Sequence, residues 1–178
     1  VTAGTGNDVL IVASGSFNQN DIIAGGTGTD SLKLSTDGST VIDSDFTNVT
    51  GVETLTMSAA DLAFTATLST LAAAAGIVTV TDLDTSADGT FSLTLAAGFT
   101  NNITVNVADD AAVKTINAAA YTKVLSVALA DTALNTAASA STSFICGNTG
   151  ELIGIRNGIK YLMLIIQKRI LNGLKEEN

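Results

Sequence analysis

The feature that most constrains the fold of this chain is a nine-residue glycine and aspartate repeat near its N-terminus. Residues 25–33 read Gly-Gly-Thr-Gly-Thr-Asp-Ser-Leu-Lys and fit the pattern G-G-x-G-x-D-x-U-x at every position. The glycines permit backbone geometry that a Cβ atom would forbid, and Leu32 follows as the inward residue of a short strand. Their carbonyls and the Asp30 carboxylate can face a hard cation, which prefers oxygen ligands. The repeat therefore predicts a cation-binding turn that leads into a strand.

A second copy of the repeat opens the chain. Residues 3–11 read Ala-Gly-Thr-Gly-Asn-Asp-Val-Leu-Ile, in which only the first glycine is replaced. Asp21 lies nine residues before Asp30 and keeps the spacing, although its glycine positions have become Phe17 and Gln19. We expect the Ca²⁺ ligands among a set of glycines and aspartates: Gly4, Gly6, Asp8, Asp21, Gly26, Gly28 and Asp30. The alternative is that these segments are ordinary polar turns.

Short runs that alternate apolar with polar residues recur between residues 49 and 130, which is typical of half-buried strands. These runs are residues 52–57, 77–81, 91–95, 103–107, 113–116 and 124–129. The centres of every second run lie roughly 22 to 26 residues apart, a repeat length typical of solenoids. We therefore expect an all-β parallel β-solenoid (β-helix or β-roll) over residues 1–150, with two strands in each coil. The alternative is an antiparallel β-sandwich, which also has closely spaced strands.

Three stretches depart from this pattern. Residues 58–76 could form a short helix that is capped by Ser58 or Ser69 and ends at Gly76, or a strand. Residues 132–143 are small and polar and are expected to be a loop or a weak last coil. Residues 151–178 change composition, and their apolar residues recur at three- and four-residue steps, which predicts an amphipathic helix from about 158 to 176. This tail is either a cap, a partner helix, part of a secretion signal, or a foreign end.

The residues that the chain lacks exclude several kinds of catalysis. It has no His and one Cys, so it cannot form a Ser-His-Asp triad, an H-E-x-x-H zinc site or an internal disulfide. Three pairs of carboxylates could be considered for glycoside hydrolysis, namely Asp43 with Asp45, Asp82 with Asp84, and Asp109 with Asp110. All are expected in solvated turns, so we expect a protein that is not an enzyme.

The charge of the chain is strongly negative and unevenly distributed. Residues 1–150 carry 13 Asp and one Glu against three Lys, a net charge of −11, whereas residues 151–178 carry three Glu against five Lys or Arg, a net charge of +2. A field this negative repels nucleic acid and suits the binding of cations. We therefore expect no nucleic-acid partner. No apolar run is long enough to span a bilayer, so we expect no transmembrane segment either.

The turns at residues 3–33, together with Phe-Thr-Asn-Val-Thr-Gly-Val-Glu-Thr-Leu at residues 46–55, resemble those of the secreted repeats-in-toxin (RTX) proteins. More narrowly, the chain is similar to bacterial surface-layer proteins and large secreted adhesins. The resemblance covers residues 1 to about 60 by motif and extends to about 150 by composition. It implies calcium-dependent folding, export to the cell surface without a cleaved N-terminal signal, and a structural or adhesive role.

We therefore expect a calcium-stabilised, self-associating segment of a surface layer, matrix or adhesin. Its expected partners are further copies of itself, as an oligomer or polymer, and a cell-surface polysaccharide. One alternative is an accessory calcium- or carbohydrate-binding module of a secreted enzyme. Another is a protein that binds ice or a crystalline surface through the outward Thr residues of segments 54–56 and 79–81.

Overall fold

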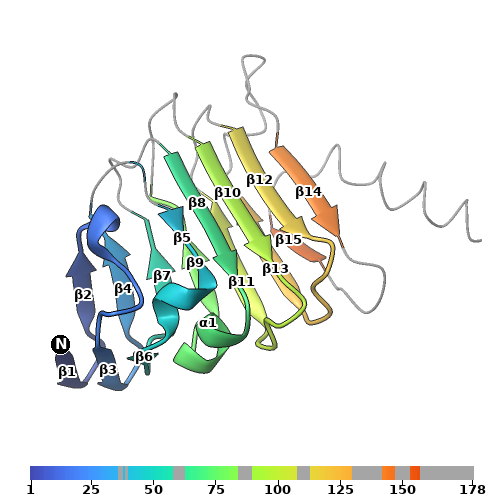
Figure 1. Ribbon diagram of the computed structural model, residues 1–178. Helices are drawn as coiled ribbons and strands as arrows, with labels where there is room; N and C mark the ends of the chain where they lie inside the picture. Colours follow the sequence, from blue (N-terminus) through green and yellow to red (C-terminus); the bar gives the residue numbers. More distant parts are fainter. Residues whose placement is uncertain are drawn as a thin grey trace, which may run out of the picture.

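The chain winds into parallel coils that stack along one axis, from the N-terminal strands to β14 and β15 at the other end (Figure 1). A computed structural model describes residues 1–35, 38, 40–57, 63–83, 90–107, 113–129, 142–146 and 153–156. The strands are β1 (Thr2–Thr5), β2 (Val9–Val12), β3 (Ile23–Thr27), β4 (Ser31–Leu34), β5 (Thr40–Val41), β6 (Val49–Thr50), β7 (Thr54–Thr56), β8 (Ala63–Leu68), β9 (Thr79–Thr81), β10 (Thr90–Leu95), β11 (Ile103–Val107), β12 (Val113–Ala118), β13 (Leu125–Leu129), β14 (Thr142–Cys146) and β15 (Ile153–Arg156). The helical segments are η1 (Ser14–Ser16), η2 (Asp43–Phe46) and α1 (Thr70–Ala75).

Every strand pairing in the described residues is parallel, and the strands form three sheets. A seven-stranded sheet has the order β15-β13-β11-β9-β7-β4-β2, and a five-stranded sheet has the order β14-β12-β10-β8-β5. A short three-stranded sheet, β1-β3-β6, completes the N-terminal coils. The parallel β-solenoid that the repeat spacing predicts is thereby confirmed, and the antiparallel sandwich is wrong. Two of the strands that the sequence predicted, at residues 103–107 and 91–95, match β11 and most of β10.

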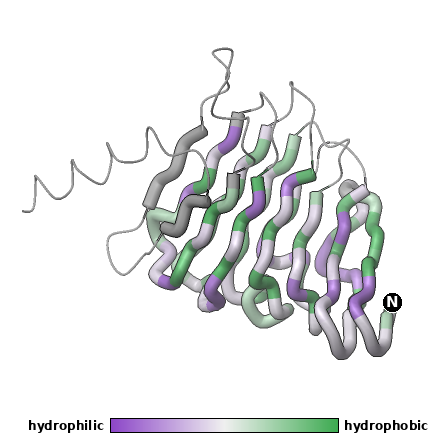
Figure 2. The backbone as a smooth tube through the Cα atoms, turned by 180° about the vertical axis from the view of Figure 1, so that it is seen from behind, coloured by the Kyte–Doolittle hydropathy of each residue, from purple (hydrophilic) through white to green (hydrophobic). Residues whose placement is uncertain are grey.

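The core lies between the sheets and consists of side chains stacked in register, one from each coil. Along the seven-stranded sheet this column is formed by Leu10, Leu32, Leu55, Val80, Val105 and Val127, all buried. On the five-stranded sheet Phe64 stacks on Phe91 with ring centroids 5.5 Å apart. Figure 2 shows the alternation along the strands, where apolar positions follow polar ones. Successive side chains of a strand point to opposite faces, so every second residue points into the core. Because the chain has few aromatic residues, most of these inward side chains are aliphatic.

Residues 58–76, for which the sequence left helix or strand open, contain both. Strand β8 is followed directly by helix α1, which ends at Gly76 with a left-handed φ of 111°. Ser69 stands at the N-cap, but its side chain makes no capping hydrogen bond. The Asp43 carboxylate of the preceding coil accepts the N–H groups of Ser69, Leu71 and Ala72 at 2.8, 3.1 and 2.9 Å instead. Asp43, expected in a solvated turn, is therefore the cap of a helix in its neighbour.

Asp82 was also expected to be solvated, and this is wrong. Its side chain is buried after strand β9, where its Oδ2 lies 2.6 Å from Nζ of Lys114. Lys114 occupies an inward position of β12, in register with Phe91 of β10. An ion pair is how both charges are accommodated inside the core. Asp84, Asp109 and Asp110 lie outside the described residues.

The sequence predicted that the solenoid ends at residue 150, but one strand of the seven-stranded sheet lies beyond that residue. Strand β15 pairs with β13, so residues 153–156 belong to the seven-stranded sheet rather than to a separate tail. Strand β14 begins at Thr142, inside the stretch expected as a loop or last coil, and pairs with β12. The amphipathic helix expected over 158–176 lies outside the described residues. Among the described residues, no helix has the length and apolarity needed to cross a bilayer.

Asp45, the last of the carboxylates expected in solvent, is buried in η2. Burial raises the pKa of Asp45 above its ordinary value, while the N–H of Ile42, which donates to its Oδ2 at 2.8 Å, acts in the opposite direction. The nearby charge of Asp21 adds to the rise. Because the folded protein holds this proton more tightly than the unfolded chain, Asp45 contributes stability below its ordinary pKa. That contribution is lost as the pH rises through the raised value.

Replacing Asp45→Asn should remove this pH dependence, since the side-chain amide oxygen can still accept the Ile42 N–H. The free energy of unfolding of the variant minus that of the wild type should become more positive between about pH 4 and about pH 7. Urea unfolding followed by circular dichroism at the two pH values measures this difference. A difference that stays constant would show that Asp45 titrates alike in both states.

Candidate metal-binding turns

The glycine turns of the first two coils stack so closely that side chains are excluded between them. Gly26 has a φ of 105°, and a Cβ atom there would lie 1.9 Å from the carbonyl oxygen of Gly4. Gly28 has a φ of 142°, and its Cβ atom would lie 2.0 Å from the carbonyl oxygen of Gly6. Both conformations and both contacts require glycine. The structure therefore brings the four predicted glycines together as two stacked pairs.

The aspartates of the two repeats are also stacked, and a third acidic residue continues the column. The Oδ1 atom of Asp30 accepts the N–H of Asp8 at 2.8 Å. In turn, Oε2 of Glu53 accepts the N–H of Asp30 at 2.7 Å. Each carboxylate thus binds the backbone of the coil that precedes it. This arrangement follows from the register, since Val9, Ser31 and Thr54, the residues after the three acids, are paired in β2, β4 and β7.

One oxygen of each aspartate is buried without a partner. Asp30 is fully buried, and its Oδ2 atom has no hydrogen-bond partner, as is also true of Oδ2 of half-buried Asp8. A Cβ atom on Gly25 would lie 2.7 Å from this Asp30 oxygen and 1.8 Å from the carbonyl oxygen of Gly51 in the next coil. Two oxygen atoms of different coils therefore lie close to Gly25, an approach that a side chain at this position would prevent.

This donor set fits a hard cation such as Ca²⁺, which takes carboxylate and carbonyl oxygens. The residues that would hold it are Asp30 and Gly51, together with other carbonyl oxygens of the turns. No group of three or more acidic, His or Cys side chains that could hold a metal occurs in the part of the chain that the structure describes. A metal here would therefore depend on backbone oxygens as well as carboxylates, as the glycine content of the repeat suggests.

Asp21 does not join the other predicted ligands. It precedes strand β3, whereas Asp30 follows that strand, so the two carboxylates lie at opposite ends of β3. Its Oδ2 atom accepts the N–H of Asn18, three residues earlier, at 2.9 Å, which is a local bond within the turn before β3. The nine-residue spacing to Asp30 therefore corresponds to the length of one strand with its turn, not to one stacked coil.

Two residues of the candidate site were not expected from the sequence: Gly51 and Glu53. The signal that could have identified Glu53 is the step between coils, because Asp8, Asp30 and Glu53 follow one another at 22 and 23 residues. The nine-residue pattern hides this step, since Glu53 has no glycine doublet before it.

The Thr residues of segments 54–56 and 79–81 form two short in-register columns on the seven-stranded sheet. Thr54, Thr79 and Thr104 are in register, but Ser126 follows them, and Asn106 follows Thr81 in the neighbouring column. The Thr56 hydroxyl also lies 2.9 Å from the Ser31 hydroxyl, so part of the face hydrogen-bonds to itself.

No family model, curated protein or solved structure matches the chain. The class of protein is therefore given by its own topology, which is that of a parallel β-solenoid with stacked glycine and acidic turns at its N-terminal end.

The stacking of the glycine turns gives a direct test of their role. Gly26→Ala should lower the free energy of unfolding by at least about 1–3 kcal/mol, because it combines a strained φ with a clash against Gly4. Gly15→Ala is the matched control, since no atom lies within 4 Å of its Cβ position, and its effect should stay within about 0.5 kcal/mol. Equal stabilities of the two variants in urea unfolding would contradict this account.

Proposed function

We propose that this chain is a segment of an extracellular structural protein, of the surface-layer, matrix or adhesin kind, whose N-terminal coils are stabilised by Ca²⁺. The observation that carries the proposal is the fully buried Asp30 carboxylate with an unpartnered oxygen beside the carbonyl of Gly51. The glycine repeats and their resemblance to the RTX turns support the same ion. In this proposal Ca²⁺ is a structural ligand that joins one coil to the next.

The burial of the Asp30 carboxylate is the energetic reason for a bound cation. Burying a carboxylate costs several kcal/mol unless hydrogen bonds or an opposite charge compensate for it. Asp30 receives one hydrogen bond, from the N–H of Asp8, and no cationic side chain of the described residues pairs with it. Coordination of Ca²⁺ by the second oxygen would remove the cost. The N-terminal coils would then fold to their full stability only where Ca²⁺ is abundant.

Abundant Ca²⁺ points to the exterior of the cell, where modules bind the ion at about 10⁻⁴–10⁻³ M. The net charge of −9 suits such a place, because it favours solubility and attracts cations. Self-association belongs to the proposal as well, since an uncovered strand edge is a template for another strand. Contact with a cell-surface polysaccharide remains part of the proposed role.

The proposal is of a protein without catalytic activity. The carboxylates that the sequence offered for glycoside hydrolysis are used by the fold wherever they are described. Asp43 caps helix α1, Asp45 binds the backbone of Ile42, and Asp82 pairs with Lys114. None of these carboxylates is left to act as a general acid or a nucleophile.

Calcium should stabilise the wild type and lose most of its effect in Asp30→Asn. With Ca²⁺ at about 100 times its Kd, stabilisation by one site is about 2.7 kcal/mol, which corresponds to a rise in Tm of about 5–10 °C. In a chelator the order should reverse, and the variant should melt above the wild type. The reason is that it removes a buried charge and places a side-chain N–H near the carbonyl oxygen of Gly51.

The control is Asp21→Asn, which makes the same chemical change before β3 instead of after it. Its response to Ca²⁺ should equal that of the wild type in thermal melts followed by circular dichroism. If the chelator leaves the wild-type melt unchanged, or if Asp21→Asn abolishes the response and Asp30→Asn does not, the assignment of the site to Asp30 is wrong.

A further inference from the structure

A buried pair of charged side chains interrupts two apolar columns of the core. Asp82 follows strand β9, and the register of β7, β9 and β11 places it between Met57 of the preceding coil and Val107 of the next. Lys114 takes the facing position on the five-stranded sheet, which Phe91 occupies in the preceding coil. The Nζ atom of Lys114 lies 2.6 Å from Oδ2 of Asp82, and the side chains are 5% and 0% exposed. Two facing positions that are apolar in the preceding coils thus carry an amine and a carboxyl group.

Stability of the fold does not by itself explain why these two positions are charged. Taking two charges out of water has a cost that their attraction only partly returns, and a pair of apolar residues is often at least as stable. Met57 and Phe91 show that this chain can fill the same positions with apolar side chains. The cost falls when the proton passes from Lys114 to Asp82, because this leaves a neutral amine beside a neutral carboxylic acid. A neutral amine is a nucleophile, whereas an ammonium group is not.

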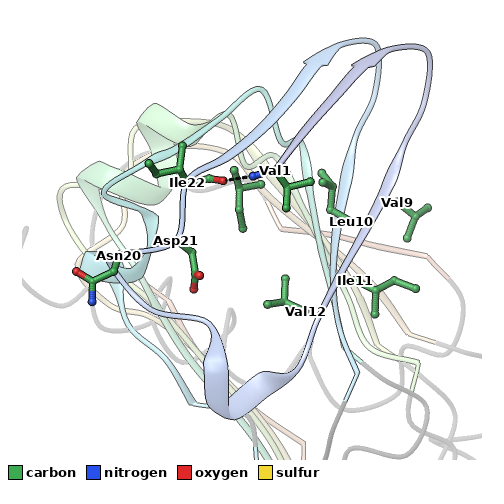
Figure 3. Close-up of a pocket in the computed structure, with 9 residues that line it drawn as sticks. Val1, Val9, Leu10, Ile11, Val12, Asn20, Asp21 and Ile22 are labelled. Atoms are coloured by element: carbon green, nitrogen blue, oxygen red, sulfur yellow. Dashed lines mark hydrogen bonds between the residues drawn. The ribbon is translucent and has the colours of Figure 1, made fainter.

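Solvent has little access to the pair. The side chains of Met57, Val107 and Phe91, which lie above and below it in the columns, are buried as well. The core is open elsewhere, in a pocket between β2 and the segment before β3 that Leu10 and Asp21 help to line (Figure 3). Strand β9 lies three strands away from β2 in the order of the sheet. A site closed to water prevents the hydrolysis of a product that forms in it.

The contact also holds the amine close to a position from which it can react. Since Cγ of Asp82 is bonded to Oδ2, Nζ of Lys114 lies within one bond length of the separation of about 3–3.5 Å at which reacting atoms are aligned. Groups oriented in this way react as if present at about 10⁵–10⁸ M. Proximity therefore favours a condensation that the same groups would not undergo as separate molecules in water.

We propose that Lys114 and Asp82 are a modification site and form an isopeptide bond across the core. The neutral Nζ attacks Cγ of the protonated carboxyl group, and the Nζ–Cγ bond forms. A proton passes from Nζ to the departing hydroxyl group, and the Cγ–O bond breaks to release one water molecule. No atom is oxidised or reduced, and no co-reactant is consumed. The product is a secondary amide without charge.

The bond would join strand β12 of the five-stranded sheet to the end of β9 in the seven-stranded sheet. A cross-link between residues 32 positions apart restricts the unfolded chain as a disulfide does, in a protein whose single Cys cannot form an internal one. The bond needs no Ca²⁺ and lies outside the glycine turns, so it goes beyond the proposed function and does not depend on it.

Mass spectrometry of the intact, denatured full chain tests the bond directly. The mass of the wild type should be lower than that of its sequence by one water molecule. After chymotryptic digestion, a branched peptide should join the segments that contain Asp82 and Lys114. A wild type that is folded by circular dichroism and has the full mass of its sequence overturns the proposal, whatever its response to Ca²⁺.

Two variants distinguish this bond from other losses of water. Lys114→Arg keeps the positive charge beside Asp82, but its guanidinium cannot be deprotonated in a protein, so its mass should be that of its full sequence. Asp82→Asn should form the same amide by releasing ammonia in place of water, and its mass deficit should change accordingly. Lys114→Met, which restores an apolar residue, should also have its full mass, and it serves as a second variant in case Lys114→Arg folds poorly.

A deficit of one water that persists in Lys114→Arg or Lys114→Met would overturn the proposal, because the loss would then arise elsewhere. Cyclisation at the Asp-Gly sequences of residues 37–38 and 88–89 is one such source. A deficit of water in place of ammonia in Asp82→Asn, or a digest in which Asp82 and Lys114 occur only in separate linear peptides, would overturn it equally.

Discussion

In-register parallel pairing puts each residue of this protein directly beside its counterpart in the neighbouring coils, about 4.8 Å away. For apolar residues this repetition is favourable, and it produces the continuous column from Leu10 to Val127. For charged residues it is unfavourable, because each carboxylate would face another. The structure of the N-terminal coils is a solution to this conflict. Asp30 and Glu53 each turn one oxygen to a backbone N–H of the preceding coil.

Hydrogen bonds satisfy only part of the acidic column, and this is where a cation has a role. The second oxygen of Asp30 has no hydrogen-bond partner, and it lies with the Gly51 carbonyl oxygen close to Gly25, where there is no side chain. Further along the solenoid the same register position is taken by Val78, Ile103 and Leu125, which need no compensation. The proposed calcium dependence is therefore confined to the first coils. The later coils are held by apolar stacking and by the buried pair of Lys114 with Asp82.

The sequence predicted those parts of the fold that depend on residues close to one another in the chain. Strand β11 and the step of about 22 to 26 residues between coils follow from alternation and periodicity, which act within a few residues. The roles of Asp43, Asp82 and Glu53 depend instead on partners 23 to 32 residues away, in other coils. Asp21 was wrongly grouped with Asp30 because the two lie nine residues apart in the sequence. A local spacing of this kind does not determine which residues stack in neighbouring coils. Only the register of the coils separates Asp21 from Asp30.

The most direct test of the central claim is the position of the metal itself. A crystal structure of the chain grown with Ca²⁺, with anomalous diffraction data, should place a calcium peak beside Gly25. The peak should lie about 2.3–2.6 Å from Oδ2 of Asp30 and from the carbonyl oxygen of Gly51. A well-ordered turn at Asp30 without such a peak, or calcium bound only elsewhere, would contradict the account.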